Sequence, residues 1–390
     1  MSMRAVGLMM VAATMLVVAL STGAPLYYLL FAAMATMLAL ALITATATAL
    51  TLSVSSQPSR TRVARGDSVS LKLLVRRRTI LPVSEIEVLF SSPSGDGDGG
   101  SMAITLGPMA SREYRYALRC PHRGRYEVGA VGARVTDIFG LFTIGRRLRG
   151  CSFKLDVTPR VRQMEPMVLS PSDLGRQSRI VMTEDASSPS DVRAWRDGDV
   201  LKRVHWKLTM RKRELMVRNY EESARPDTLI LMDVSPISAS RSQALDIEDG
   251  LCEAALSMAL AQLRSDHGVR MPLACSQPAE LAGQSAADFS RFLDAMVGVP
   301  FDGPYAFELL MTVEMRRMQR TGGVVLVTSR LSAAIADLAL RMRSLGMQVM
   351  FIWVTESART EALELLTRIE LGGVTTMKVD PWDAAGRVAS

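Results

Sequence analysis

The sequence predicts three regions in series: an N-terminal transmembrane helical hairpin, a β-sandwich domain and a C-terminal α/β doubly wound domain. Three patterns lead to this prediction. The first sixty residues are almost free of charge, the next stretch alternates apolar and polar residues, and the remainder alternates short apolar runs with helical periodicity. The expected boundaries are 1–56 for the hairpin, 57–150 for the sandwich, 151–226 for a connector and 227–390 for the α/β domain.

The hairpin is predicted from two apolar runs, Ala5–Leu20 and Pro25–Leu52, with no charged residue between Arg4 and Arg60. A hydrocarbon core of about 30 Å needs roughly 20 apolar helical residues, and the intervening STGAP supplies the glycine and proline of a turn. Arginines follow the second run, whereas the turn carries no charge, so the positive-inside rule places the body in the cytoplasm. We therefore expect a two-pass protein of a bacterial inner (cytoplasmic) membrane, with its N-terminus and its C-terminal domains in the cytoplasm. The alternative is that the first run is a cleaved signal peptide.

The composition of the 390 residues disfavours several kinds of function but does not identify one. A net charge of +7 permits contact with nucleic acid or anionic lipid headgroups without requiring it. The four cysteines lie far apart, which indicates reduced thiols in a reducing compartment and does not favour a zinc site. The sequence contains no Walker loop, HExxH or GxSxG, and no GxGxxG follows a strand. We assign no catalytic residue, expect no cofactor and predict that the protein is not an enzyme.

The sandwich is predicted from apolar residues that recur at every second position between turn-forming clusters. Such runs are typical of half-buried antiparallel strands, and their number and spacing resemble an immunoglobulin fold. The connector that follows begins with the strand-like FKLDVTP. The predicted inward-facing residues of the sandwich are Val69, Leu71, Leu73, Val75, Ile86, Val88, Phe90, Tyr114, Tyr116, Leu118 and Cys120.

The α/β domain begins with the apolar strand DTLILMDVS, and ligands of doubly wound sheets bind at the carboxyl ends of such strands. The turn DVSPISAS that follows resembles the start of a von Willebrand factor A domain, where Asp-x-Ser-x-Ser helps to hold a divalent cation. Here Asp233 and Ser235 are the candidate metal ligands, but Ile237 occupies the third position, and Thr328 and Ser329 stand where the fourth strand usually supplies an aspartate. The metal site is therefore degenerate. Magnesium is possible but not expected, and a polar turn that caps the next helix is the simpler interpretation.

A basic segment, DVRAWRDGDVLKRVHWKLTMRKRELMVRNYEE, spans residues 191–222. It predicts a short helix from Val200 to about Arg211, with Arg203, Lys207 and Arg211 along one side, followed by a strand. Three interpretations remain: a catalytic centre at His205, a nucleic-acid surface, and a structural or docking element. We favour the third, with Trp206 and His205 buried and nucleic acid not a partner, because acidic neighbours balance the basic residues.

The same segment resembles the hallmark of the domain-of-unknown-function 58 family, and HRGRYEVGAVGARVTDIFGLF resembles a second segment of that family. The resemblance implies a membrane-anchored, von Willebrand A-like protein that acts with a MoxR-type AAA+ ATPase in the assembly or maturation of protein complexes. Arg203, Lys207 and Arg211 are then the candidates for docking this partner. The alternative function is a metal-dependent hydrolase that uses His205 with Asp191 or Asp199. The hallmark residues are Arg193, Trp195, Gly198, Asp199, Arg203, His205, Trp206, Lys207 and Arg211.

Overall fold

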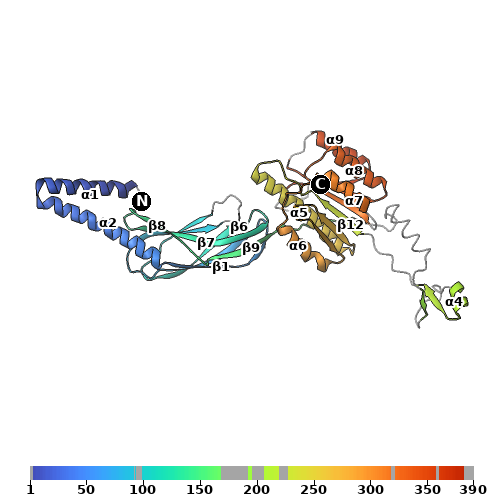
Figure 1. Cartoon of the computed structure of the whole chain (residues 1–390), viewed down its shortest axis with the longest axis horizontal. Helices are drawn as coiled ribbons and strands as arrows, with labels where there is room; N and C mark the ends of the chain where they lie inside the picture. Colours follow the sequence, from blue (N-terminus) through green and yellow to red (C-terminus); the bar gives the residue numbers. More distant parts are fainter. Residues whose placement is uncertain are drawn as a thin grey trace. The chain divides into compact units, whose positions relative to one another are not determined.

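The computed structural model describes residues 3–91, 93, 99–167, 192–195, 206–218, 227–317, 321–356 and 360–381. The chain divides into two compact units, Met1–Thr158 and Pro159–Ser390 (Figure 1). The first unit contains the helical hairpin and the β-sandwich, and the second contains the α/β domain.

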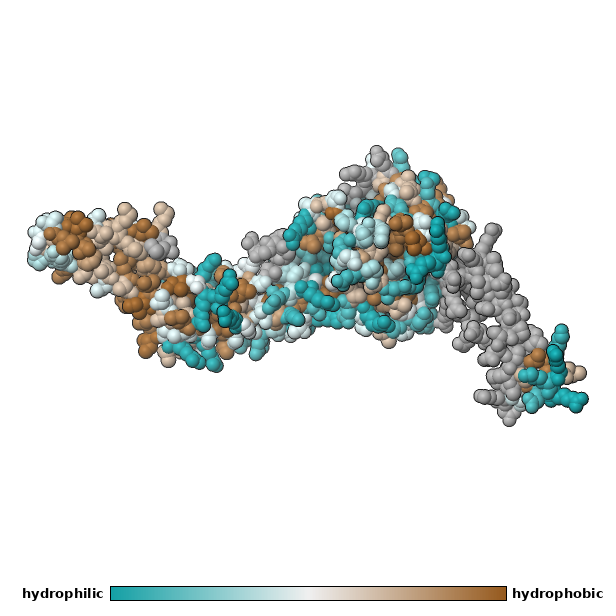
Figure 2. All heavy atoms as spheres, viewed as in Figure 1, coloured by the Kyte–Doolittle hydropathy of each residue, from teal (hydrophilic) through white to brown (hydrophobic). Residues whose placement is uncertain are grey.

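The hairpin consists of α1 (Met3–Thr22) and α2 (Pro25–Thr51), which are both long and apolar enough to cross a membrane. Gly23 adopts a φ of 68°, which favours glycine, and Pro25 lies in the first turn of α2, where its missing N–H costs nothing. Hydrophobic residues predominate on the face of the hairpin that Figure 2 shows. The predicted helices are therefore present, with boundaries within two residues of the apolar runs.

Two sheets form the β-sandwich. One has the order β1-β3-β6, and the other has the order β2-β9-β7-β4-β5, with β8 also paired to β7. The strands are β1 (Ser53–Pro58), β2 (Arg62–Ala64), β3 (Ser68–Arg76), β4 (Val83–Ser91), β5 (Ser101–Ile104), β6 (Ser111–Arg119), β7 (Gly124–Asp137), β8 (Thr143–Arg147) and β9 (Ser152–Thr158).

The core of the sandwich lies between these sheets. Alternation in β3 buries Val69, Leu71, Leu73 and Val75, which confirms the predicted inward face. The other sheet, which includes β4, contributes to the same apolar cluster. The rings of Phe90 and Tyr116 stack with centroids 4.2 Å apart. The sheet extends beyond the expected boundary at residue 150, because β9 pairs with β7, and the compact unit ends at Thr158.

The passage from helix to sheet is short. α2 ends at Thr51 and β1 begins at Ser53, so a single residue, Leu52, separates them. Nη1 of Arg146 in β8 donates hydrogen bonds to the carbonyl oxygens of Ala49 and Leu50, at 2.9 and 2.6 Å, and to that of Leu52 at 3.2 Å. A cation at the carbonyl end of a helix satisfies acceptors that have no partner within the helix.

The second unit is built on a sheet with the order β14-β13-β12-β15-β16-β17, parallel except for β14. The chain runs from β12 outward to β13 and then returns to β15 on the other side of β12, which creates a crevice at the carboxyl ends of β12 and β15. The strands are β12 (Asp227–Met232), β13 (Val269–Leu273), β14 (Ala279–Gly283), β15 (Thr321–Thr328), β16 (Gln348–Val354) and β17 (Thr375–Val379). The helices are α5 (Arg241–Arg264), η3 (Ala286–Asp288), α6 (Phe289–Val297), α7 (Phe307–Arg317), α8 (Ala333–Ser344) and α9 (Thr360–Leu371).

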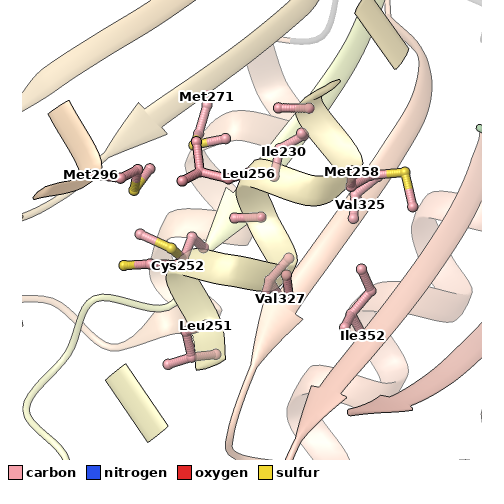
Figure 3. Close-up of a cluster of buried hydrophobic side chains, with 14 of the residues drawn as sticks. Ile230, Leu251, Cys252, Leu256, Met258, Met271, Met296, Val325, Val327 and Ile352 are labelled. Atoms are coloured by element: carbon pink, nitrogen blue, oxygen red, sulfur yellow. The ribbon is translucent and has the colours of Figure 1, made fainter. Parts of the chain in front are cut away.

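Helices cover both faces of this sheet, as predicted. Ile230 and Met232 face α5 and α6 in a cluster that Figure 3 shows around Leu256, while Leu229 and Leu231 face α7, α8 and α9. Strands buried on both faces read as continuous apolar runs, which explains the sequence of β12.

A smaller element lies within the family hallmark segment. β10 (Val192–Ala194) pairs antiparallel with β11 (Met216–Arg218), and α4 (Trp206–Lys212) lies between them in the sequence.

Candidate functional site

The candidate site lies in the crevice at the carboxyl ends of β12 and β15. Asp233 follows β12, and its N–H donates to the carbonyl of Val327 at 2.9 Å, so the sheet ladder fixes its backbone. The N–H of Gly303 donates to the carbonyl of Val234, the residue after Asp233, at 3.0 Å. The side chain of Asp233 is buried, so its carboxylate needs partners from within the protein.

Hydroxyl and backbone groups supply three of these partners. The N–H of Ser235 donates to Oδ1 of Asp233 at 3.1 Å, and the hydroxyl of Ser235 donates to the same oxygen. Thr328 donates its hydroxyl to Oδ2 at 2.9 Å from the end of β15. The two neighbouring strands therefore meet at one carboxylate.

Arg330 supplies the balancing charge. Its Nε lies 3.3 Å from Oδ2 of Asp233, and its Nη2 lies 3.4 Å from Oδ1 and also donates to the hydroxyl of Ser235. The arginine side chain is 49% exposed and the aspartate side chain is 2% exposed. A half-exposed guanidinium thus covers a buried carboxylate, and the Thr328 hydroxyl orients it by accepting the backbone N–H of Arg330 at 3.0 Å.

This arrangement fits a guanidinium better than Mg²⁺. Magnesium requires several oxygen ligands in near-octahedral geometry, whereas both oxygens of Asp233 already accept hydrogen bonds and Ser235 donates its proton to one of them. Position 237 supplies no side-chain oxygen, because Ile237 packs against the α5 side of the core. The hydroxyl of Thr328 is directed at Asp233 as a hydrogen-bond donor.

Asp233, Ser235 and Thr328 were expected at this site from the sequence, whereas Arg330, which completes the site, was not. The signal was present in VLVTSR, where an arginine follows the end of a predicted buried strand by two positions. Arg330 contacts a carboxylate 97 positions away, and only the strand order places them together.

A hollow of about 240 Å³ lies beside the C-terminal half of α5, away from this crevice. The N–H of Arg162 donates to the hydroxyl of Ser257 at 2.9 Å, and its guanidinium lies 3.7 Å from the carboxylate of Glu253. These contacts attach residues 160–167 to α5, and we assign the hollow a structural role.

The hallmark segment is described in part. Lys207 and Arg211 are exposed on α4 and are four residues apart, as predicted, which places them on one side of the helix. Trp206 is 60% exposed, so the prediction that it is buried is wrong; none of the residues of α4 is buried. Residues Asp191, Gly198, Asp199, Arg203 and His205 lie outside the described residues.

Thr209 links α4 to β11. Its hydroxyl accepts the N–H of Met216 at 3.0 Å, and its carbonyl accepts the N–H of Arg213 at 2.8 Å. The N–H of Trp195 donates to the carbonyl of Leu215 at 2.8 Å, which continues the pairing of β10 with β11. The order of hallmark residues in the sequence therefore reflects a small β-α-β element.

The fold and the site define a class: a chain with two apolar N-terminal helices, a β-rich body with sheets and helices, and an internal ion pair at a sheet crevice. Residues 191–379 match the family described as "Protein of unknown function DUF58". This match spans the hallmark segment and the α/β domain, and it confirms the resemblance inferred from the hallmark segment.

Solved structures show only distant likeness. The CARDB domain of a Pyrococcus furiosus protein in complex with di-metal ions is 15% identical, with a TM-score of 0.21, and the match covers 27% of this chain and 91% of that one. The alkylpurine DNA glycosylase AlkC of Pseudomonas fluorescens is 15% identical, with a TM-score of 0.19 and coverage of 36% and 41%. A cycloisomaltooligosaccharide glucanotransferase of Paenibacillus sp. is 8% identical, with a TM-score of 0.18 and coverage of 84% and 52%. This chain thus spans about half or less of the length of the latter two. No curated protein matches the chain.

Proposed function

We propose that this protein is a membrane-anchored accessory protein that acts with a MoxR-type AAA+ ATPase in the assembly or maturation of protein complexes. In this proposal α1 and α2 span the membrane. They hold an immunoglobulin-like sandwich and a von Willebrand A-like domain at its cytoplasmic face.

The observation that carries the proposal is the ion pair between Asp233 and Arg330. The carboxylate of Asp233 accepts three hydrogen bonds and pairs with a guanidinium, so it is poorly placed to bind a metal. A site of this kind supports recognition through shape and charge rather than metal-dependent chemistry.

Membrane anchoring is supported by the two apolar helices and by the charges that follow them. Arg60, Arg62 and Arg65 come directly after the first strand of the sandwich, and the turn between the helices, at Gly23 and Ala24, is uncharged. The positive-inside rule therefore favours a cytoplasmic body, where an AAA+ ATPase has access to it.

The docking surface that we propose is the basic side of α4. Lys207 and Arg211 are exposed there, and Arg203 belongs to the same pattern in the sequence. Rim charges of this kind raise the association rate and select partners of opposite charge.

The test uses the full-length chain extracted from membranes in a mild detergent. We expect it to retain a MoxR-type AAA+ ATPase in pull-downs with ATP. The double substitution Lys207→Glu with Arg211→Glu should weaken this retention. The matched control is Arg316→Glu with Arg341→Glu, which makes the same change of charge at exposed positions of α7 and α8. Retention of no AAA+ ATPase with or without nucleotide would contradict the proposal.

A further inference from the structure

The second family segment, DIFGLF, forms a tightly held loop between β7 and β8. Asp137, the last residue of β7, is buried, and its carboxylate accepts the N–H of Phe139 at 2.8 Å and that of Phe142 at 2.6 Å. Gly140 adopts a φ of 67°, and its N–H donates to the carbonyl of Asp137 at 3.1 Å. A carboxylate that accepts N–H groups on both sides of a left-handed glycine holds the backbone of the loop in place.

The loop divides its apolar residues between two environments. Leu141 and Phe142 are buried against the helical hairpin, in one cluster with Ala5 of α1 and with Ala41 and Ala45 of α2. Ile138 and Phe139 point away from this cluster and are 50% and 46% exposed. Large exposed apolar side chains on a rigid loop indicate a contact surface.

The lengths of the helices place this loop at a membrane boundary. α1 has 20 residues and α2 has 27, which correspond to about 30 Å and about 40 Å of helix. α1 alone matches the hydrocarbon core, so its first turn, at Ala5, marks one face of the bilayer. Leu141 and Phe142 contact α2 at that level, and the rest of α2 projects beyond it along β7 and β8.

Two neighbouring loops present apolar residues at the same end of the sandwich. Thr79, in the loop between β3 and β4, lies 3.1 Å from Thr48 of α2 through their hydroxyls, and the next residue, Ile80, is exposed. The N–H of Met109 donates to the carbonyl of Thr79 at 3.1 Å, and the side chain of Met109 is also exposed. Hydrophobic residues continue from the hairpin onto the adjoining end of the sandwich in Figure 2.

Basic residues border this apolar group. Arg4, Arg78 and Arg147 are exposed in α1, in the loop between β3 and β4, and in β8. Arg146 is held by the carbonyl end of α2. Arginines beside apolar loop tips complement the phosphates of anionic lipids.

We propose that this end of the sandwich, formed by the loops that contain Ile80, Met109, Ile138 and Phe139, is seated in the headgroup layer of a bilayer with anionic lipids. The four apolar side chains enter the interface, and Arg78 and Arg147 contact lipid phosphates. The inference rests on the proposed membrane anchoring and extends it, because the β-domain itself becomes a membrane-binding surface.

The test is depth-dependent quenching on the full-length chain in nanodiscs that contain phosphatidylglycerol. A cysteine at Phe139→Cys is labelled with an environment-sensitive fluorophore, and spin-labelled lipids report its depth. The four native cysteines are buried, so the introduced thiol is the one that reacts under mild conditions. We expect blue-shifted emission, quenched most by labels placed near the headgroups, since interfacial residues lie about 5–10 Å into the boundary.

Two matched positions keep the outcomes distinct. Val11→Cys, on an exposed position near the middle of α1, should be quenched most by deep labels if α1 spans the bilayer. Ser68→Cys begins β3, whose 9 residues place it about 30 Å from the loop end, and it should not be quenched. Quenching at Val11 without quenching at Phe139 would overturn the inference and leave the anchor intact, whereas loss of both would overturn the anchor itself. A Phe139 probe that shifts only as the protein-to-lipid ratio rises would assign the loop to a contact between copies of the chain, and would also overturn the inference.

Discussion

Asp137 and Asp233 are both buried carboxylates at the end of a strand, one in each compact unit, and different groups satisfy them. Asp137 accepts two backbone N–H groups of its own loop, so its partners cannot leave without unfolding of the loop. Asp233 accepts one backbone N–H, two hydroxyls and a guanidinium, and rotation of one half-exposed side chain would release the guanidinium. The loop around Asp137 is therefore held as a fixed surface, whereas the cationic partner of Asp233 can be exchanged.

The largest effect is expected from Asp137→Ala. It leaves the N–H groups of Phe139 and Phe142 without an acceptor, at a cost of about 2–4 kcal/mol in the free energy of unfolding of the first unit. All four tryptophans lie in the second unit, so hydrogen exchange of β7 and β8 is the appropriate measurement. The control is Glu85→Ala, which removes an exposed carboxylate from a strand paired with β7. Equal exchange in both variants would show that Asp137 does not hold the loop.

A smaller loss is expected from Arg330→Met. Removal of one partner from a buried ion pair costs several kcal/mol, but this arginine is half exposed and three hydrogen bonds to Asp233 remain. We expect a loss of about 1–2 kcal/mol in the second unit, measured by denaturant unfolding with tryptophan fluorescence, because Trp353 lies beside the site. The double variant with Asp233→Asn should recover part of this loss. A double variant as unstable as the sum of the single ones would show that the two residues act independently.

The Arg330→Ser variant tests whether the guanidinium occupies the place of a cation. It removes the positive charge and adds a hydroxyl, so Mg²⁺ should stabilise this variant by up to about 1 kcal/mol at concentrations several times its Kd. The unfolding midpoint of the wild-type chain should not respond to Mg²⁺, because Arg330 already balances Asp233. If Mg²⁺ raised the unfolding midpoint of the wild-type chain as much as that of the variant, this would show that the ion displaces Arg330.

The smallest effect concerns Cys120, which reports opening of the sandwich. Burial, together with the charge of Asp67, raises the pKa of the Cys120 thiol from 9.0 to about 11. Its modification by iodoacetamide should therefore be slow at pH 8 and rise about tenfold per pH unit as the thiolate forms. Because the unfolded chain loses this proton first, this thiol lowers the stability of the first unit as pH rises from about 9 to about 11.

The modification rate of Cys120 also distinguishes a change at Asp137 from a change at the Asp233–Arg330 pair. Asp137→Ala should accelerate modification of Cys120, since both lie in the first unit, whereas Arg330→Met should leave the rate unchanged. Acceleration by both variants would show that the two units open together.

The sequence predicted the features that depend on local pattern. The apolar runs predicted α1 and α2 because charge-free stretches and the Gly-Pro turn are visible in the sequence, and alternation predicted the buried face of β3. Features that depend on distant partners were not accessible. β9 was assigned to the connector because its partner β7 lies earlier in the chain, and Arg330 was missed because its role requires the order of β12 and β15.

The hallmark segment illustrates a different limit. Periodicity indicated which side of α4 is basic, and Lys207 and Arg211 lie as expected. It could not show how much of Trp206 is covered, because burial at the first turn of a short helix depends on what packs there. The role of Thr209 was equally inaccessible, since it consists of a hydrogen bond to β11 across a turn.

The junction at Leu52 has a mechanical consequence. With one residue between α2 and β1, and Arg146 fastened to the last carbonyls of the helix, no slack remains between the helix and the sheet. A pull or torque applied to the sandwich is transmitted to α2 within one peptide unit. In a bilayer, such a force would tilt α2, because there is no flexible linker between α2 and β1 to extend. The first unit would then pivot as one body at the membrane surface.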